Sequence, residues 1–175
     1  MTTAIDILDT IAKVGVGALI SGISSLYILK KKQKGELDKL GNQRRVEHFE
    51  DISQKVGAVN HIFSKYSSLA IESTRYGDAW PAARREELDE VTNELVAAYA
   101  KLAEAESVLL LLGEKRMEKA LKLYTTKIAN FRKEVYVGRQ DIEESQIIAI
   151  KKEISVLKEQ FYDILSLRYD RAVND

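Results

Sequence analysis

The amino-acid sequence predicts an all-α protein: an N-terminal transmembrane helix followed by an elongated antiparallel three- or four-helix bundle with coiled-coil-like packing. Three observations support this prediction. A run of 16 residues at positions 14–29 contains no acidic or basic side chain that is charged at neutral pH. Beyond it, apolar residues recur every three or four positions through four long segments, which is the spacing of packed helices. The 175 residues include one proline and are 31% charged, as is typical of long amphipathic helices.

The first expected element is a membrane span over residues 14–29. A bilayer core about 30 Å thick asks for roughly 20 apolar residues, so the run is short and needs Lys13 to extend its ammonium group to the interface. A buried helix of a soluble bundle is the alternative; a helix lying flat on the membrane fits poorly because the run has no polar face. The expected anchor residues are Val14, Leu19, Ile20, Ile23, Leu26, Ile28, Leu29, Lys30, Lys31 and Lys32.

The charges beside the run predict its orientation. Residues 30–40 carry five lysines against Glu36 and Asp38, whereas residues 1–13 carry two aspartates and one lysine. The positive-inside rule then places the N-terminus outside and the rest of the chain in the cytoplasm. A cleaved signal peptide fits poorly, because its positive charge would precede the apolar run. The expected organisation is a flank at 1–13, the span at 14–29, a basic juxtamembrane linker at 30–42 and a cytoplasmic bundle at 43–175.

Four periodic segments follow the linker, whose own turn signals are Gly35 and Gly41. The strongest break is Tyr76–Pro81, because glycine ends a helix and proline suits a first turn; Gly113 and Gly138 mark the other two. Helices are expected over residues 43–74, 81–112, 114–136 and 141–173. Their apolar seams are Val46, Phe49, Ile52, Val56, Val59, Phe63, Tyr66 and Leu69 or Ala70; Leu88, Val91, Leu95, Ala98, Leu102, Ala105 and Leu109; Met117, Leu121, Tyr124, Ile128, Phe131 and Val135; and Ile147, Ile150, Ile154, Leu157, Phe161 and Ile164. The last seam ends at Arg168, a charged position where the helix is expected to fray.

The lengths of these segments predict how they pack. Short connectors make consecutive helices antiparallel. The third segment is the shortest, so its neighbours should remain uncovered at one end. Residues 108–112 read VLLLL and are apolar all round the helix, which predicts burial on more than one side.

A search for catalytic and metal-binding patterns finds none. The chain has no cysteine, and its two histidines, His48 and His61, lie 13 residues apart on one expected helix, about 20 Å along its axis. His61 is expected to be a partly buried structural residue. Glu-x-x-His pairs and phosphate-binding glycine loops are missing from the sequence. Lysine plus arginine equals aspartate plus glutamate at 27 each, which gives no electrostatic reason to expect nucleic acid. We therefore expect no enzyme activity, no cofactor, no metal and no nucleic acid.

Two further features suggest contacts with other proteins. Small residues repeat every four positions in the expected span, a pattern that lets two helices approach closely in lipid. They form the stripes Gly17, Ser21 and Ser25, and Ala18 and Gly22. Trp80, the single tryptophan, stands in a turn next to Tyr76. It is either a lid over the end of the bundle or, together with Tyr76, an exposed anchor for a partner.

One segment resembles a known kind of protein. Residues 97–124, AAYAKLAEAESVLLLLGEKRMEKALKLY, contain an apolar helix end, a Gly113-Glu114 turn and an amphipathic helix that begins Met-x-x-Ala-Leu. This segment resembles bacterial single-span membrane proteins of unknown function that carry a cytoplasmic helical bundle. The resemblance implies the same architecture and a bacterial or phage origin. It implies no catalytic or binding residue.

Three functions are compatible with these features. The leading hypothesis is a non-enzymatic, membrane-anchored interaction or regulatory protein that acts through its bundle, by self-association or by binding a protein partner. The alternative is a small oligomeric membrane effector, a channel or permeabilising protein assembled through the span, with Ser21, Ser24 and Ser25 lining a polar path. A soluble helical-bundle protein is the third.

Overall fold

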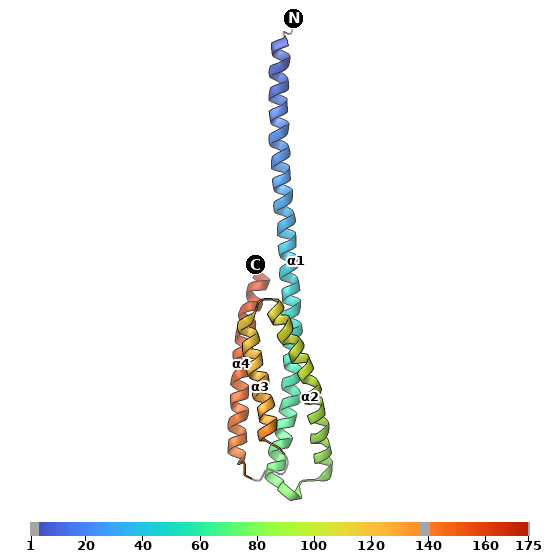
Figure 1. The fold of residues 1–175 in the computed structure, drawn as a ribbon, viewed down its shortest axis with the longest axis vertical. Coiled ribbons are helices and arrows are strands. Elements are labelled where there is room, and N and C mark those ends of the chain that lie inside the picture. The colour runs from blue at the N-terminus through green and yellow to red at the C-terminus, as the bar shows by residue number, and fades with distance from the viewer. Residues whose placement is uncertain (1–3, 137–140, 175) are drawn as a thin grey trace. The chain divides into compact units, whose positions relative to one another are not determined.

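A computed structural model shows an all-α fold (Figure 1). It describes the backbone of residues 4–136 and 141–174, and the side chains of Glu36, 39–136 and 141–174. The chain divides into two units, one that ends at Arg44 and one that runs from Arg45 to Asn174. The helices are α1 (Ala4–Tyr76), the short 3-10 helix η1 (Gly77–Ala79), α2 (Ala82–Leu111), α3 (Lys115–Glu134) and α4 (Glu144–Asn174).

The predicted turns after residues 76 and 112 are confirmed, and both depend on a glycine. Gly77 has a φ of 52° and Gly113 a φ of 77°, the left-handed region in which a side chain costs about 1–2 kcal/mol. The expected break at Gly35 and Gly41 differs from the structure, because α1 stays helical through both residues. A glycine inside a helix costs only about 1 kcal/mol relative to alanine, which strong helix formers on either side can offset.

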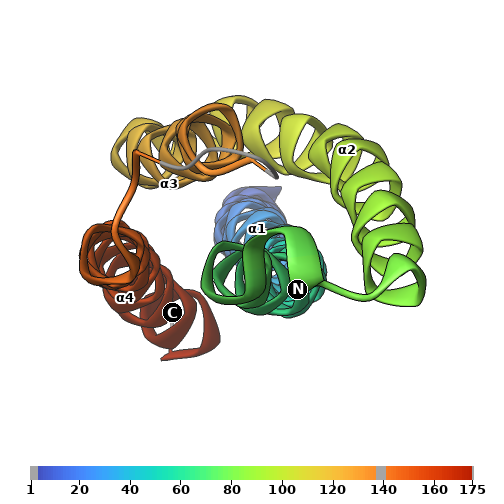
Figure 2. The same ribbon diagram turned by 90° about the horizontal axis from the view of Figure 1, so that it is seen from below.

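The unit from Arg45 to Asn174 is a four-helix bundle of antiparallel helices, which decides between the three and four helices expected. The view along the bundle in Figure 2 shows α2, α3 and α4 following one another in an arc beside α1. Among these helices α3 packs most closely, with α4 on one side and α2 on the other. The last third of α1 therefore lies against the concave side of a layer made by the other three helices.

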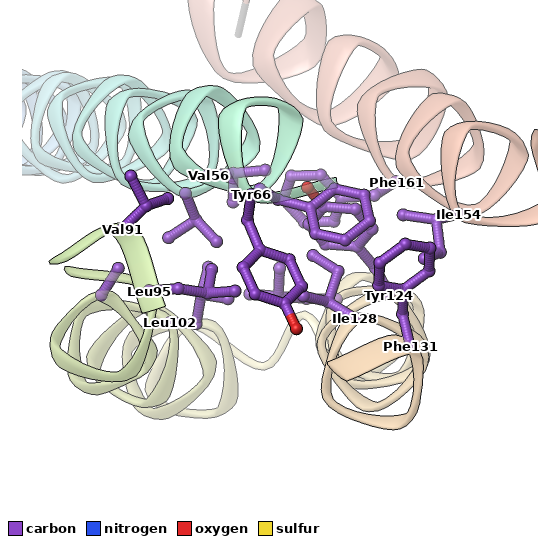
Figure 3. Packing of buried hydrophobic residues seen from close by; sticks show 14 of the residues in the cluster. Val56, Tyr66, Val91, Leu95, Leu102, Tyr124, Ile128, Phe131, Ile154 and Phe161 are labelled. Carbon is purple, nitrogen blue, oxygen red and sulfur yellow. The ribbon is translucent and has the colours of Figure 1, made fainter. Parts of the chain in front are cut away.

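The predicted seams form the core of this bundle. Every seam position expected in α2 and α3 is buried, and so are those of α1 from Phe49 onward. Figure 3 shows side chains from all four helices meeting: Val56 and Tyr66 of α1, Val91, Leu95 and Leu102 of α2, Tyr124, Ile128 and Phe131 of α3, and Ile154 and Phe161 of α4. The aromatic rings contact edge to face, with the centroids of Phe63 and Phe131 5.2 Å apart.

Helix α4 follows its predicted seam only in part. Ile147, Ile154 and Phe161 are buried as expected, but Ile150, Leu157 and Ile164 are only partly buried, and the next buried residue after Phe161 is Leu165. A straight α-helix drifts by about 20° per heptad relative to a strict seven-residue repeat. After two heptads the drift moves the buried face one residue along the chain.

The prediction that residues 108–112 are buried on more than one side is wrong. Leu109 is fully buried, but Leu110 is 53% exposed and Leu111 83% exposed. Helix α2 ends here: Leu112 is its C-cap, and the backbone turns at Gly113. A helix in the outer layer of a bundle buries one face only. Consecutive residues point to different sides of a helix, so some residues of a leucine run longer than half a turn are exposed to solvent.

The short third helix does not leave the expected gap. Val135, just after α3, is 1% exposed, and Ile142, just before α4, is 7% exposed. The Tyr66 hydroxyl donates a hydrogen bond of 3.1 Å to the Val135 carbonyl. Val135 and Ile142 therefore cover the core beside the end of α3.

Candidate functional site

The bundle has an open groove between α1 and α4, with a volume of about 380 Å³. Phe49 and Leu165, 2% and 5% exposed, belong to the core and form its apolar lining. Phe49 and Leu165 point inward because they belong to the seams of their helices. The polar residues beside the seams lie at the edge of the groove. The eight residues of this α1–α4 groove are Phe49, Glu50, Ser53, Gln54, Tyr162, Leu165, Ser166 and Tyr169.

Two tyrosine hydroxyls of α4 form hydrogen bonds to α1 across the groove. Tyr162 donates a hydrogen bond of 3.2 Å to the Ser53 carbonyl, and Tyr169 donates one of 3.0 Å to Glu50 Oε1. The first bond reaches the backbone next to Gly57, where a Cβ would lie 3.8 Å from the Tyr162 hydroxyl. The bond to the Glu50 carboxylate raises the pKa of Tyr169, because ionising the phenol would place two negative charges side by side.

A second groove, between α1 and α2, is ionic. Its lining includes His61, Lys65 and Arg84, with Glu87 facing them. Lys65 Nζ lies 3.3 Å from Glu87, and Arg84 pairs with Glu87 and, at 2.5 Å, with Glu72. The Arg84 guanidinium lowers the pKa of Glu72, so this carboxylate stays ionised. These charges neutralise one another. The ion pairs in the second groove therefore join α1 to α2.

The end of the bundle near the α2–α3 turn is held by a network of Arg45, Glu114 and Arg168. Glu114 is 8% exposed. Arg168 Nε lies 3.0 Å from one of its carboxylate oxygens and Arg45 Nη2 lies 3.5 Å from the other. Arg45 also donates a 2.8 Å hydrogen bond to the Leu112 carbonyl at the end of α2. One buried carboxylate thus joins α1, the α2–α3 turn and α4, and its position before α3 also suits the helix dipole.

Two tyrosines stay neutral. Burial raises the pKa of Tyr99 to about 12 and raises the pKa of Tyr124 as well. Neither phenol can therefore act as a base near neutral pH. Tyr124 belongs to the core, where Figure 3 shows it among the aromatic side chains, and the partly buried Tyr99 packs against that core.

The structure separates the two aromatic residues of the α1–α2 turn. Trp80 is 2% exposed, which fits the alternative in which its ring closes the end of the bundle, whereas Tyr76 is 54% exposed. His61 and His48 are both exposed, so the expectation of a partly buried structural histidine at 61 is wrong. Position 61 is two residues from Val59 and two from Phe63, on the solvent side of the α1–α2 groove.

The predicted anchor and association residues, Val14 to Lys32, lie outside the described side chains. Within the part of the chain whose side chains are described, no helix is long and apolar enough to cross a membrane. In that same part, no three histidine or acidic side chains are grouped so that they could hold a metal ion.

Comparison with known proteins gave no match. No protein-family model, no curated protein and no solved structure matches this chain. The resemblance of residues 97–124 to bacterial single-span membrane proteins therefore stays an expectation from the sequence.

Proposed function

We propose that this protein is a non-enzymatic, membrane-anchored interaction or regulatory protein whose helical bundle binds a protein partner or a second copy of itself. The observation that supports it most directly is the charge-free run at 14–29 followed at once by Lys30, Lys31, Lys32 and Lys34. In this proposal the run spans the inner membrane once, with the N-terminus outside and the bundle in the cytoplasm.

The surface of the bundle offers apolar contacts for a partner. Several large apolar side chains are more than half exposed: Leu110, Leu111, Leu123, Ile148 and Leu167. They stand on three different helices, among charged residues that keep the bundle soluble. Leu110 and Leu111 are adjacent at the end of α2, and the exposed ring of Tyr76 stands at the opposite end of the bundle.

Membrane fractionation tests the anchor. The full-length protein is expected to stay in the membrane after a carbonate wash, and a version lacking residues 1–34 is expected in the soluble fraction. A sharper variant carries Ile20→Arg and Ile23→Arg, because each arginine near the middle of a span costs about 2.5–3.5 kcal/mol on insertion scales. Its control carries the same two arginines at Leu123 and Val156, which are exposed on the bundle, and should remain in the membrane.

The outcomes separate the alternatives. Full-length protein in the soluble fraction would refute the anchor and leave the soluble-bundle hypothesis. If the anchor holds, crosslinking of the full-length and arginine variants follows. A crosslinked ladder that survives loss of the span supports association through the bundle.

A second candidate, an oligomeric membrane effector, is favoured by the stripe Gly17, Ser21 and Ser25. It predicts that Gly17→Ile abolishes the crosslinked ladder while the protein stays in the membrane. It also predicts that induced expression depolarises cells loaded with a membrane-potential dye. Unchanged membrane potential at high expression would count against it.

A further inference from the structure

The α1–α4 groove has the chemistry of a binding site for a cation. Three of its eight lining residues are aromatic, namely Phe49, Tyr162 and Tyr169, and one is an acid, Glu50. None of the eight is a lysine, an arginine or a histidine. Aromatic rings together with a carboxylate attract ammonium groups, because both the ring face and the carboxylate are negative.

The Glu50 carboxylate is positioned but not neutralised. Its recorded partner is the Tyr169 hydroxyl, a neutral donor, at 3.0 Å. The bond fixes one oxygen of the carboxylate and leaves its charge in place. Nearby cations are engaged elsewhere: Lys55 Nζ lies 3.0 Å from Asp51 and 3.1 Å from Glu104, and Arg168 pairs with Glu114. The groove therefore holds a fixed negative charge beside aromatic rings.

The size and the lining of the groove limit the ligand. A volume of about 380 Å³ is at the small end of the range for ligand sites, about 300–1,000 Å³. Phe49 and Leu165 offer apolar surface, and the carboxylate repels phosphate. These features favour a small organic cation with a methylated or alkyl ammonium group and no phosphate. A lipid headgroup that bears a phosphate is disfavoured.

We infer that the α1–α4 groove binds a small organic cation, with Glu50 as counter-ion and Tyr162 and Tyr169 as its aromatic walls. Tyr169 has two roles: its ring contacts the cation, and its hydroxyl positions the Glu50 carboxylate. The site lies wholly within the bundle, so it does not depend on membrane anchoring.

The test uses the full-length protein in a neutral, choline-free detergent, with choline chloride as the probe. Binding is measured by saturation-transfer NMR and by calorimetry. Choline is expected to bind saturably. Dimethylbutanol, its uncharged isostere, is expected to bind at least about tenfold more weakly, because it lacks the charge that both the carboxylate and the rings attract. Phosphocholine is also expected to bind more weakly, because of repulsion from Glu50.

Variants assign the roles of the residues. Glu50→Gln and Tyr169→Leu should each weaken choline binding about tenfold, whereas Tyr169→Phe, which keeps the ring, should lose less. Asp163→Asn is the matched control: it removes one carboxylate charge from the exposed residue next to Tyr162 on α4, which does not line the groove, and should bind choline like the native protein. Circular dichroism checks that each variant is folded.

Three results would overturn the inference. One is no saturable choline binding by the folded native protein, and another is equal binding of choline and dimethylbutanol. The third is unchanged affinity in Glu50→Gln. Phosphocholine that binds as well as choline would overturn the assignment to an organic cation without phosphate and point to a lipid headgroup.

Discussion

Truncation of Leu121 tests the packing of the bundle with a control two residues away. Leu121 is fully buried in α3, whereas Leu123 on the same helix is 59% exposed. Both positions have the same residue type and helix, so helix propensity cancels in the comparison. Only burial distinguishes Leu121→Ala from Leu123→Ala.

The expected difference follows from the carbon atoms removed. Leucine to alanine deletes three carbons, and at about 0.8 kcal/mol per buried methylene the transfer term is about 2.4 kcal/mol. A cavity that the neighbours only partly fill raises the cost to about 3–4 kcal/mol, within the usual range for buried leucines. Leu123→Ala removes carbons that are already largely in water and should cost under about 0.5 kcal/mol. The exposed Leu110 should behave like Leu123, even when replaced by aspartate.

Urea unfolding is the assay, followed by circular dichroism and by the fluorescence of Trp80. This single tryptophan is 2% exposed, so its emission should shift when the bundle opens. In thermal unfolding followed by the same two signals, Leu121→Ala should lower the midpoint by roughly 6–16 °C, at about 2–4 °C per kcal/mol for a chain of this size. Equal losses in Leu121→Ala and Leu123→Ala would refute the assigned faces of α3. Unfolding of the Leu110→Asp variant would restore the expectation that residues 108–112 are buried on more than one side.

Three further predictions concern single positions, each checked by the same unfolding assay. Gly57→Ala should stabilise the bundle by about 0.5–1 kcal/mol, because the new methyl group meets only the Tyr162 hydroxyl, at 3.8 Å; Gly113→Ala, at a φ of 77°, should instead destabilise it by about 1–2 kcal/mol. Glu114→Gln should cost about 1–2 kcal/mol, because it weakens bonds to Arg45 and Arg168, and high salt should reduce the difference from the native protein. Glu106→Gln should raise the midpoint at pH 7 but not at pH 3. Burial, and then Glu118, raises the pKa of Glu106 above its usual 4.5, so the folded state binds this proton more tightly than the unfolded state, and the stability that protonation gives is lost as pH rises through the folded-state pKa.

Periodicity predicted the fold because burial in a helical bundle is set by spacing along one chain. The seams of α2 and α3 needed no knowledge of their neighbours: an apolar residue every three or four positions defines a face, and that face becomes the core. Spacing cannot say how wide the buried face is. That width depends on how many helices pack around each one, and this is why Leu111 was expected inside and lies 83% exposed. The exposure of His61 was missed for the same reason.

The groove and the Glu114 network depend on which helix ends meet, and spacing alone carries no such information. Antiparallel order brings the part of α1 after Arg45 beside the last turns of α4, so Glu50 and Tyr169 become neighbours across 119 residues. The same order brings the α2–α3 turn to that end, where Glu114 lies between two arginines. Charged residues are common along every helix of this chain. Which of them form ion pairs depends on the lengths of the helices and on how deeply each turn is buried. Once the antiparallel order is assumed, two sequence signals could have indicated these sites. One is an acidic residue in a turn, and the other is a tyrosine one position away from a seam. The order itself follows from the short connectors, and this makes the α1–α4 groove a consequence of topology as much as of its own residues.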